Sequence, residues 1–375
     1  MKIVIAPDSF KGSLTAAEAA DAIEIGFRAV YPDAEYVKVP MADGGEGTLQ
    51  SLVDATSGTI ITQSVKGPMG DMVAGFFGIL GDSRTAVVEM AVASGIHLVN
   101  PEKQNIYLAS SFGTGELINA ALDHSCDKLI VGLGGSATND GGMGMMKALG
   151  AQFLGQGCTP LAPDVRALLQ LAKIDLQYLD PRLSKTEIVV ACDVNNPLCG
   201  KNGASRIFGP QKGATRDDIV VLDKALARYG DVLAINTGRN IAIEPGSGAA
   251  GGMGAALIGL IDAVLKPWVD LVIGIVELAK SLVDADLVIT GEGRIDSQTI
   301  HGKTPVGVAK IAKSHNLPVI CIAGSVKDGT DIIHQMGIDK IYSVTEGDYD
   351  LTEALKDAGH KLSQSAQKIA KSLNP

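Results

Sequence analysis

The sequence predicts an α/β protein in which a doubly wound parallel sheet, built from both ends of the chain, carries an inserted α/β domain with a mixed sheet. Short and wholly apolar strands alternate with helical periods near both termini, which is typical of a parallel sheet covered on both faces. Hairpin-like segments lie between these ends, and a purely parallel sheet does not need them. The 375 residues are enough for two domains with a core each.

The start of the chain holds two strand-loop-helix units. An apolar strand at 3–6 leads through a polar loop at 7–13 into a helix, whose first turn shows a capping box at Thr15 and Glu18. A second strand at 36–39 is followed by another glycine-bearing loop and a helix. In a doubly wound sheet such loops gather at the carboxyl ends of the strands, where ligands bind.

The hydrophobic period changes near residue 60. Segments 59–65, 72–80 and 85–90 alternate or run apolar and are separated by turns with glycine, as β-hairpins are. A domain with a mixed sheet is therefore expected to begin there. The expected domains are residues 1–60 plus 283–375 for the doubly wound domain and residues 61–282 for the inserted one, with a cleft between them.

Periodicity places the other elements along the chain. Helices are expected at 115–122, at 143–149 and, as the last element, at about 352–373, and strands at 129–131, 188–191, 319–322 and 340–344. The glycine-rich stretch 246–285 is expected to be helical. Its G-x-G-x-x-G pattern at 246–251 is better explained by close helix packing than by a nucleotide site.

The stretch 286–313 carries the densest group of polar residues. It begins with an apolar strand at 287–289 and ends with a helix whose first turn suits Pro305. The loop between them brings carboxylates, hydroxyls and cations together, which favours a ligand site over a solvated turn. The acids Glu292 and Asp296 are candidates for that site.

The end of this loop, Gly302-Lys303-Thr304, is similar to the end of a phosphate-binding P-loop. The pattern needs a glycine five residues before Gly302, and Ser297 stands there, so the sequence has no Walker motif. A lysine and backbone amides at the start of a helix nevertheless form a good anion site. Lys303 is therefore a candidate phosphate ligand.

Two motifs of the expected inserted domain point to anionic ligands. The run GLGGSATNDGG at 132–142 follows a strand and precedes a helix, so it is either a phosphate cradle or a purely structural turn. Asp193 ends a buried strand, and Arg206 and Lys212 follow close behind it in sequence. This group suits the activation of a hydroxyl beside a bound anion, and the alternative is an aspartate that caps a turn.

Composition excludes several classes of partner. The net charge of −10 argues against nucleic acid and anionic membranes. Five cysteines without a C-x-x-C pair indicate the reduced thiols of a cytoplasmic protein, and six histidines show no zinc-binding spacing. The apolar run at 3–6 is too short for a signal peptide, and charges interrupt the apolar region 255–276, so buried helices are expected there instead of a membrane span.

Six blocks of the sequence carry a specific resemblance. In chain order they are PDSFKGSLTA at 7–16, ADGGEGT at 42–48, GGSATNDGG at 134–142, ACDVNNPLCG at 191–200, FGPQKGA at 208–214 and TGEGRIDSQTIHGKTPVGVA at 290–309. Together they resemble the bacterial glycerate kinase family, the type-I glycerate 2-kinases, over nearly the whole chain. The resemblance implies ATP- and Mg²⁺-dependent phosphorylation of D-glycerate to 2-phosphoglycerate. It also implies a flavodoxin-like domain built from both chain ends and an inserted domain.

The matching blocks suggest roles for individual residues, which we state as hypotheses. Phosphoryl transfer needs positioning and neutralisation of charge, so cations and Mg²⁺ are expected to matter most. The expected catalytic residues are Asp193 as the base and Lys11 and Lys212 as phosphate ligands. The expected binding residues are Ser9, Arg206 and Asp43 for glycerate, Gly134, Gly135, Ser136, Asn139 and Lys303 for the nucleotide, and Asp43, Glu292 and Asp296 for Mg²⁺.

Two alternatives stay open from the sequence, a kinase of another small hydroxy acid and a non-catalytic sensor of hydroxy acids. Carboxylates beside lysines in the same loops favour a kinase, because a sensor of anions has little use for metal-binding acids. The sequence leaves the phosphorylated hydroxyl and the oligomeric state open, with a homodimer among the options.

Overall fold

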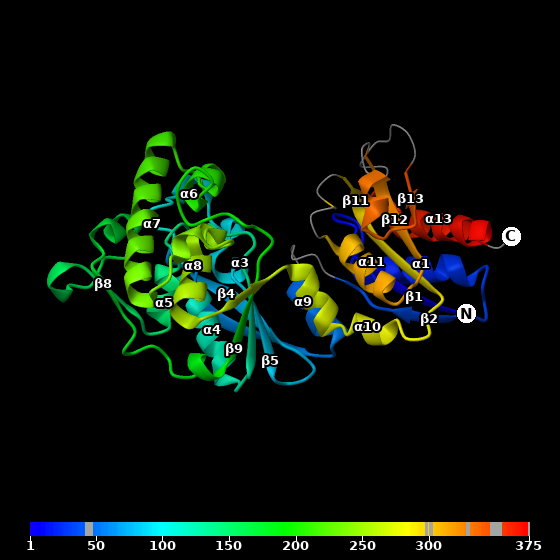
Figure 1. Ribbon diagram of the computed structural model, residues 1–375, viewed down its shortest axis with the longest axis horizontal. Helices are drawn as coiled ribbons and strands as arrows, with labels where there is room; N and C mark the ends of the chain where they lie inside the picture. The colour runs from blue at the N-terminus through cyan, green and yellow to red at the C-terminus, as the bar shows by residue number, and fades with distance from the viewer. Residues whose placement is uncertain (42–47, 297–298, 300–302, 328–330, 346–354, 374–375) are drawn as a thin grey trace. The chain divides into compact units, whose positions relative to one another are not determined.

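The computed structural model describes residues 1–41, 48–296, 299, 303–327, 331–345 and 355–373 (Figure 1). Contacts within the chain divide it into two compact units, and each has a mixed α/β fold. Unit 1 is formed by Met1–Thr56 with Trp268–Pro375, and unit 2 by Ser57–Pro267. The sequence analysis placed the second boundary after residue 282, whereas this division assigns α9 (Trp268–Ile275) and α10 (Leu278–Ser281) to unit 1.

Unit 1 contains a parallel sheet whose strands come from both ends of the chain. Its spatial order is β13-β12-β11-β1-β2, and every neighbouring pair is parallel. The strands are β1 (Lys2–Pro7), β2 (Glu35–Lys38), β11 (Leu287–Ile295), β12 (Val319–Val326) and β13 (Lys340–Ser343). The order reverses direction between β1 and β11, and open α/β sheets bind ligands outside the carboxyl ends of the strands at such a switch point.

Helices cover both faces of this sheet. Besides α9 and α10 they are α1 (Ala16–Arg28), α2 (Thr48–Ala55), α11 (Thr304–Ser314) and α13 (Ala358–Leu373). α1 and α13 pack together on the face to which Ile3 and Ile5 point, while α11 lies on the other face (Figure 1). The capping box expected at the start of α1 is confirmed, because the Thr15 amide donates to Glu18 at 2.8 Å and the Glu18 amide to Thr15 Oγ1 at 3.2 Å.

β11 and β12 are longer than the sequence predicts. Each was expected to be a short apolar strand followed by a loop, but they stay paired as far as Ile295 and Val326. The glycines in this region serve close strand approach instead of turning, since a Cβ at Gly324 would lie 2.4 Å from the Gly293 carbonyl oxygen. Tertiary pairing overrides the polar character of the segment. Glu292 is therefore a strand residue.

Unit 2 contains a six-stranded mixed sheet with the order β10-β9-β6-β5-β4-β3. Its strands are β3 (Thr59–Lys66), β4 (Met72–Ile79), β5 (Thr85–Glu89), β6 (Lys128–Gly132), β9 (Glu187–Ala191) and β10 (Val264–Lys266), and β7 (Gln152–Leu154) and β8 (Lys173–Asp175) form a separate pair. β3, β4 and β5 are antiparallel neighbours, which confirms the expected hairpins. β10 is a correction, because the stretch that contains it was expected to be helical and instead pairs with β9.

The helices of unit 2 surround a large apolar core. They are α3 (Ala91–Ser94), α4 (Phe112–Asp123), α5 (Met143–Ala148), α6 (Ala204–Phe208), α7 (Arg216–Thr237) and α8 (Ala249–Ile261). The sequence analysis did not expect α7, although a capping box at Thr215 and Asp218 begins it and Gly238 ends it with a φ of 69°.

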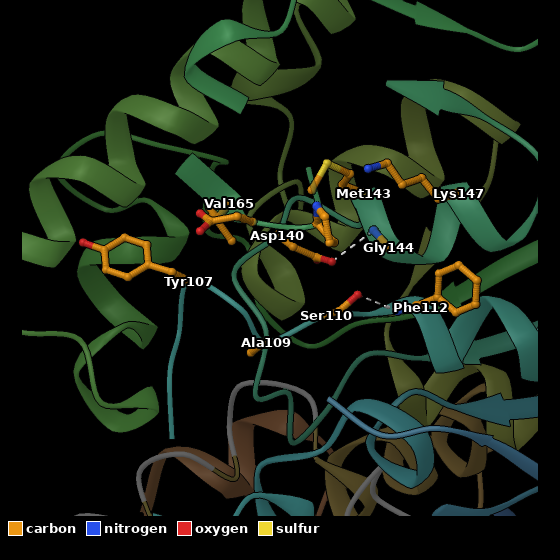
Figure 2. A pocket seen from close by; sticks show the side chains of 11 residues that line it. Tyr107, Ala109, Ser110, Phe112, Asp140, Met143, Gly144, Lys147 and Val165 are labelled. Carbon is orange, nitrogen blue, oxygen red and sulfur yellow. Dashed lines mark hydrogen bonds between the residues drawn. The ribbon is translucent and has the colours of Figure 1, made fainter. Parts of the chain in front are cut away.

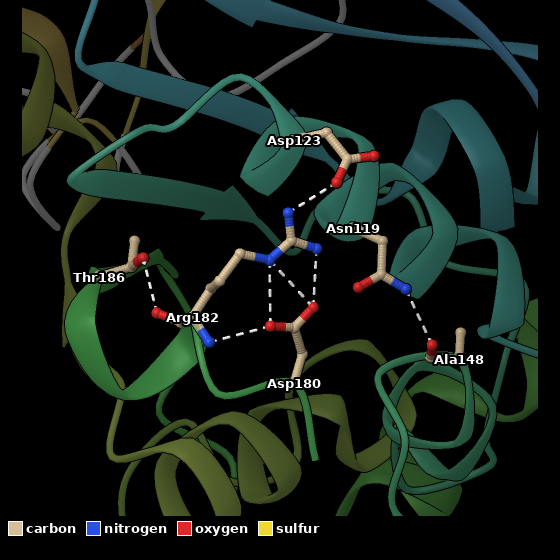
Figure 3. Close-up of polar contacts among 6 residues, drawn as sticks. All are labelled: Asn119, Asp123, Ala148, Asp180, Arg182 and Thr186. Carbon is tan, nitrogen blue, oxygen red and sulfur yellow. Dashed lines mark hydrogen bonds and ion pairs between the residues drawn. The ribbon is translucent and has the colours of Figure 1, made fainter. Parts of the chain in front are cut away.

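Arg182 fastens the end of α4 to the segment that precedes β9 (Figure 3). Its guanidinium donates to Asp123 at 2.6 Å and to both oxygens of Asp180 at 2.7 to 3.1 Å. One turn earlier in α4, the Asn119 amide donates to the Ala148 carbonyl at 2.8 Å. The bond from Asn119 fixes α4 against α5, the helix that begins directly after the glycine-rich loop 134–142.

All five cysteines are free thiols, as the sequence analysis expected. In the described part of the chain, no helix combines the length and the apolar composition that crossing a membrane requires.

Candidate active site

Two carboxylates are buried next to each other at the carboxyl ends of β1 and β11. Pro7 pairs in parallel register with Gly291, and Asp8 and Glu292 are the next residues of the two strands. The Asp8 amide donates to the Gly291 carbonyl at 2.7 Å, so the strands stay together at this point. Asp8 is 2% exposed and Glu292 is 6% exposed. The switch point of the unit 1 sheet is therefore acidic.

The start of α11 covers these carboxylates. Thr304 Oγ1, in the first turn, donates to Asp8 at 2.6 Å, and Lys303 Nζ lies 3.5 Å from a Glu292 oxygen. Thr299 Oγ1 donates to the other Glu292 oxygen at 2.8 Å. The amides at the start of a helix also favour negative charge. Hydroxyls, a lysine and the start of a helix are thus the groups that contact these two buried acids.

The other expected site residues of unit 1 lie around this pair. Ser9 is half-buried and its amide donates to Asp8, and Lys11 is exposed in the turn that follows. The Lys11 backbone approaches β11, since a Cβ at Gly293 would lie 3.1 Å from the Lys11 amide nitrogen. Asp296 directly follows β11 and lies 3.5 Å from Arg294. Asp43, expected to bind glycerate and Mg²⁺, lies outside the described residues.

In unit 2, the glycine-rich loop 134–142 connects β6 to α5. The Gly135 carbonyl accepts from the Ile96 amide at 2.9 Å, and the Ala137 amide donates to the Ser94 carbonyl at 2.9 Å. Gly135 has a φ of 72°, and residues 134 and 135 are exposed while the rest of the loop is buried. The loop is thus a rigid turn with one exposed edge.

Asp140 holds the far end of this loop. Its carboxylate is 3% exposed and accepts four hydrogen bonds, from the amide and hydroxyl of Ser111 and from the amides of Gly142 and Gly144. Figure 2 shows the bond from Gly144. A Cβ at Gly144 would lie 2.4 Å from Ser110 Oγ, so only glycine fits beside the carboxylate. These bonds join the loop, the start of α5 and the start of α4.

A cavity of about 40 Å³ adjoins Asp140, with Tyr107, Ser110 and Lys147 in its lining (Figure 2). Burial lowers the pKa of Lys147, whose amine donates to the Leu161 carbonyl at 2.8 Å. A space of this volume holds a few water molecules and is far too small for a nucleotide. We therefore assign it to the support of the loop and not to substrate binding.

Lys212 is the most unusual charged residue of unit 2. It is 2% exposed, and its amine donates to Ser136 Oγ at 2.6 Å and to the Thr138 carbonyl at 2.7 Å. Across the described ranges, no carboxylate lies within ion-pairing distance of it. Burial lowers the pKa of Lys212 to about 7, against a smaller raising effect of the Asp140 charge.

The same loop contains buried polar atoms without a hydrogen-bond partner among the described residues. These are Thr138 Oγ1 and Asn139 Oδ1, whereas Asn139 Nδ2 donates to Ser205 of α6 at 3.0 Å. The start of α8 packs on the loop from one side, since a Cβ at Gly251 would lie 2.1 Å from the Thr138 carbonyl oxygen. Close packing is thus the role of the second G-x-G-x-x-G pattern.

The structure brings only some of the expected unit 2 residues together. Ser136, Asn139 and Lys212 belong to one cluster around the loop. Arg206 is exposed on α6, and its guanidinium lies 3.7 Å from Asp223 of α7. Asp193 is exposed and follows the end of β9. Their proposed roles toward glycerate stay predictions.

Sequence reasoning assigned no role to Asp8 or Asp140. Both stand in motifs that the sequence analysis singled out, at a strand end and in the glycine-rich loop. Their burial separates them from ordinary polar loop residues, and burial of a charge depends on long-range packing. A carboxylate directly after a wholly apolar strand is the one sequence signal that points to Asp8.

The acids of unit 1 suit magnesium better than zinc or calcium. Within the described ranges, no group of three or more histidine, cysteine, aspartate or glutamate side chains converges on one point. Mg²⁺ usually takes one or two carboxylates and completes its shell with water and substrate phosphates. The buried pair Asp8 and Glu292 fits that donor set, with Asp296 nearby in sequence.

These features define an α/β protein with buried acids at the switch point of one sheet and a buried lysine on a glycine-rich loop of another. The sequence model of the glycerate kinase family matches residues 3–374 of this chain. Glycerate kinase of Bacillus subtilis strain 168 is 53% identical over 373 residues, covering 100% of this chain and 98% of the relative. Glycerate 2-kinase of Escherichia coli K12 is 50% identical, with the same coverage.

A crystal structure gives the same result. A Salmonella typhimurium LT2 protein described as a glycerate kinase 2 superposes with a TM-score of 0.91 at 51% identity, over 100% of this chain and 98% of that one. The chain belongs to the glycerate kinase family.

Proposed function

We propose that this protein is an ATP- and Mg²⁺-dependent glycerate kinase that transfers the γ-phosphoryl group of ATP to D-glycerate, with 2-phosphoglycerate as the product. The observation that carries the proposal is the full-length identity of 50% to relatives that include the glycerate 2-kinase of Escherichia coli K12. Buried acids in one unit and a buried lysine in the other support it, because phosphoryl transfer needs both a metal site and cationic phosphate ligands.

Unit 1 is proposed to hold the metal and part of the phosphate chain. Glu292, Asp296 and Asp43 are the proposed ligands, and Asp8 joins them as a buried carboxylate beside Glu292. A bound Mg²⁺ would neutralise phosphate charge. Lys303, which sits beside Glu292 at the start of α11, has the position of a phosphate ligand.

Further residues are proposed to bind the substrates. The list is Gly134, Gly135, Ser136 and Asn139 for the nucleotide, Lys11 and Lys212 for phosphate, and Ser9, Asp43 and Arg206 for glycerate. Asp193 is the proposed base, because its carboxylate is exposed just after the end of β9 and aspartate is a common general base. Both units are proposed to serve this one reaction.

We also propose the family's domain organisation for this chain. The strand order β2-β1-β11-β12-β13 has the 2-1-3-4-5 pattern of flavodoxin-like sheets, and unit 2 is inserted between β2 and β11 in sequence. A cytoplasmic location follows from the metabolic substrates and the free thiols.

The decisive experiment is incubation of the purified protein with ATP, Mg²⁺ and D-glycerate. ADP formation establishes a kinase, and absence of ADP supports a non-catalytic sensor. Phosphorus NMR of the product identifies the hydroxyl, because phosphorus couples to one proton in the 2-isomer and to two in the 3-isomer. A panel of small hydroxy acids in the same assay tests the alternative that another acid is the preferred substrate.

A further inference from the structure

The contact between Ser136 and Lys212 is more than a loop-stabilising hydrogen bond. Their side chains meet at 2.6 Å, and the residues are 8% and 2% exposed. Ser136 Oγ makes no other hydrogen bond to the described residues, so its hydroxyl proton has Lys212 Nζ as its one neighbouring acceptor. A serine hydroxyl beside a buried amine is the arrangement in which lysine serves as the base of a nucleophilic serine.

The bonding pattern around Lys212 fits a neutral amine. A charged ammonium has three hydrogens to donate, but the described residues offer it two acceptors, Ser136 Oγ and the Thr138 carbonyl. A neutral amine can keep both contacts, because it donates one hydrogen to the Thr138 carbonyl and accepts the Ser136 proton on its lone pair, which leaves one N–H without an acceptor among the described residues.

The charges around Lys212 allow this neutral form near neutral pH. Among the described residues, Asp140 is the one charged group that acts on Lys212, and its carboxylate already accepts four hydrogen bonds from other groups. It therefore raises the pKa of Lys212 less than burial lowers it, and the result is about 7. The amine is then about half deprotonated in the cytoplasmic pH range.

The backbone presents Ser136 at the exposed edge of the loop. The two preceding glycines are exposed, and Gly135 takes a φ of 72° that turns the chain just before the serine. The flanking bonds from Ile96 to Gly135 and from Ala137 to Ser94 hold this turn in place. Ser136, which is 8% exposed, directly follows these two exposed glycines.

We propose that Ser136 and Lys212 form a serine-lysine dyad that makes Ser136 a nucleophile toward electrophilic phosphorus. In the step, the Ser136 oxygen forms a bond to phosphorus, the bond from phosphorus to the leaving group breaks, and the hydroxyl proton passes to Lys212. With a fluorophosphonate the leaving group is fluoride. With ATP it is ADP, and the product is phosphoserine, a case that rests on the proposed nucleotide site.

The test of the dyad is labelling of the full-length protein by a small alkyl fluorophosphonate without nucleotide, followed by intact and peptide mass spectrometry. We expect one label per chain, on Ser136. The labelling rate should rise about tenfold per pH unit below about pH 7 and then level off, because the reactive form needs neutral Lys212. No label on the folded protein up to about pH 9, or label elsewhere only, overturns the proposal.

Variants separate the dyad from general loop reactivity. Ser136→Ala removes the acceptor, and Lys212→Met and Lys212→Arg remove the base, since a guanidinium keeps its proton at all these pH values. Each should lose labelling by about a hundredfold or more while a thermal melt shows a folded protein. Lys147→Met is the matched control, because Lys147 also has a lowered pKa near Asp140 but contacts a carbonyl and no serine. If Lys147→Met abolishes labelling or Lys212→Arg keeps it, the dyad is wrong.

A second arm distinguishes this inference from the proposed function. Protein incubated with ATP and Mg²⁺ but without glycerate should gain one phosphoryl group on Ser136, detected by mass and lost in Ser136→Ala. Fluorophosphonate labelling without this phosphorylation supports the dyad and contradicts the placement of the γ-phosphate at the loop. Kinase activity without either modification supports the proposed function and overturns the dyad.

Discussion

The two units bury opposite charges at similar places in their folds. In unit 1, Asp8 directly follows β1 and Glu292 lies on the neighbouring parallel strand β11, and both contact the start of α11. In unit 2, Lys212 lies against a loop that joins a parallel strand to a helix. Both places are strand-to-helix loops at carboxyl ends, where α/β proteins hold ligands.

The units deal with the cost of burial in different ways. The buried acids accept hydrogen bonds from threonine hydroxyls, and Glu292 also lies beside Lys303 at the start of α11. Lys212 has a loop carbonyl and a hydroxyl instead, and its pKa falls to about 7. This difference supports the proposed cation site in unit 1 and the proposed anion site in unit 2, the two kinds of site that phosphoryl transfer from a magnesium nucleotide requires.

Asp193→Asn should have the largest effect. It tests whether unit 2, which buries a lysine, also contributes an essential acid. Removing the base should lower kcat by about two to four decades while the melting temperature and nucleotide affinity stay nearly unchanged. The measurement is steady-state turnover together with a binding titration. Asp217→Asn, an exposed acid on α7, is the control. Near-normal turnover of Asp193→Asn would remove Asp193 from the mechanism.

Lys11→Ala tests whether unit 1, which buries two acids, also contributes an essential cation. Loss of one electrostatic contact to developing charge should lower kcat/KM by about two decades. Lys310→Ala, an exposed lysine of α11, should leave the rate unchanged. An unaltered kcat/KM for Lys11→Ala would show that Lys11 is an ordinary surface residue and that the acidic character of unit 1 needs no correction.

Local patterns in the sequence predict much of the fold. The apolar runs, the capping box at Thr15 and the alternating hairpin segments depend on neighbours in sequence, and the structure confirms each of them. The misses depend on distant partners. β10 exists because Val264–Lys266 finds β9, and β11 extends to Ile295 because β12 pairs with it to the end. Propensity cannot anticipate pairing partners that lie far away along the chain.

The same distinction applies to the site. Motifs identify Ser136, Asn139, Lys212 and Glu292 as polar groups at strand and helix ends, which is a local property. The contact between Ser136 and Lys212 spans 76 residues, and it forms because the segment after α6 folds back onto the loop. Burial, which lowers the pKa of Lys212 to about 7 and separates Asp8 from ordinary loop residues, is a property of the finished core that the sequence motifs do not reveal.

Glu292→Gln sharpens the assignment of the metal to unit 1. The amide keeps the hydrogen bond from Thr299 Oγ1 but loses the negative charge. The Mg²⁺ concentration for half-maximal activity should rise about tenfold, because the site loses one charged ligand. Glu277→Gln, which lies exposed before α10, is the control. An unchanged Mg²⁺ requirement would show that Glu292 does not bind the metal. The proposed cation site of unit 1 would then be wrong.

The pH profile tests whether Lys212 serves as a cation. If charged Lys212 receives phosphate, kcat/KM for ATP falls as pH rises through about 7, by roughly fivefold between about pH 7 and 8. The profile of kcat should extend to higher pH, because bound phosphate stabilises the ammonium. Lys212→Arg keeps its charge throughout, so its own profile should lose this fall. A flat wild-type profile would contradict the anionic role of unit 2.

The smallest expected effect concerns stability, and it tests whether Lys212 is kept for function. The pKa of Lys212 falls from an ordinary value of 10.5 to about 7 in the folded protein, so folding releases a proton between these values. The cost to stability is complete below about pH 7 and fades as pH approaches 10.5. Lys212→Met should therefore raise the unfolding midpoint by about 2 °C or more at neutral pH, with a smaller gain at alkaline pH, while activity is lost. Calorimetry over this pH range measures it, and Lys147→Met, half-buried, should gain less. A lower unfolding midpoint for Lys212→Met would mean that Lys212 stabilises the loop. Its role in unit 2 would then be structural and not the binding of an anion.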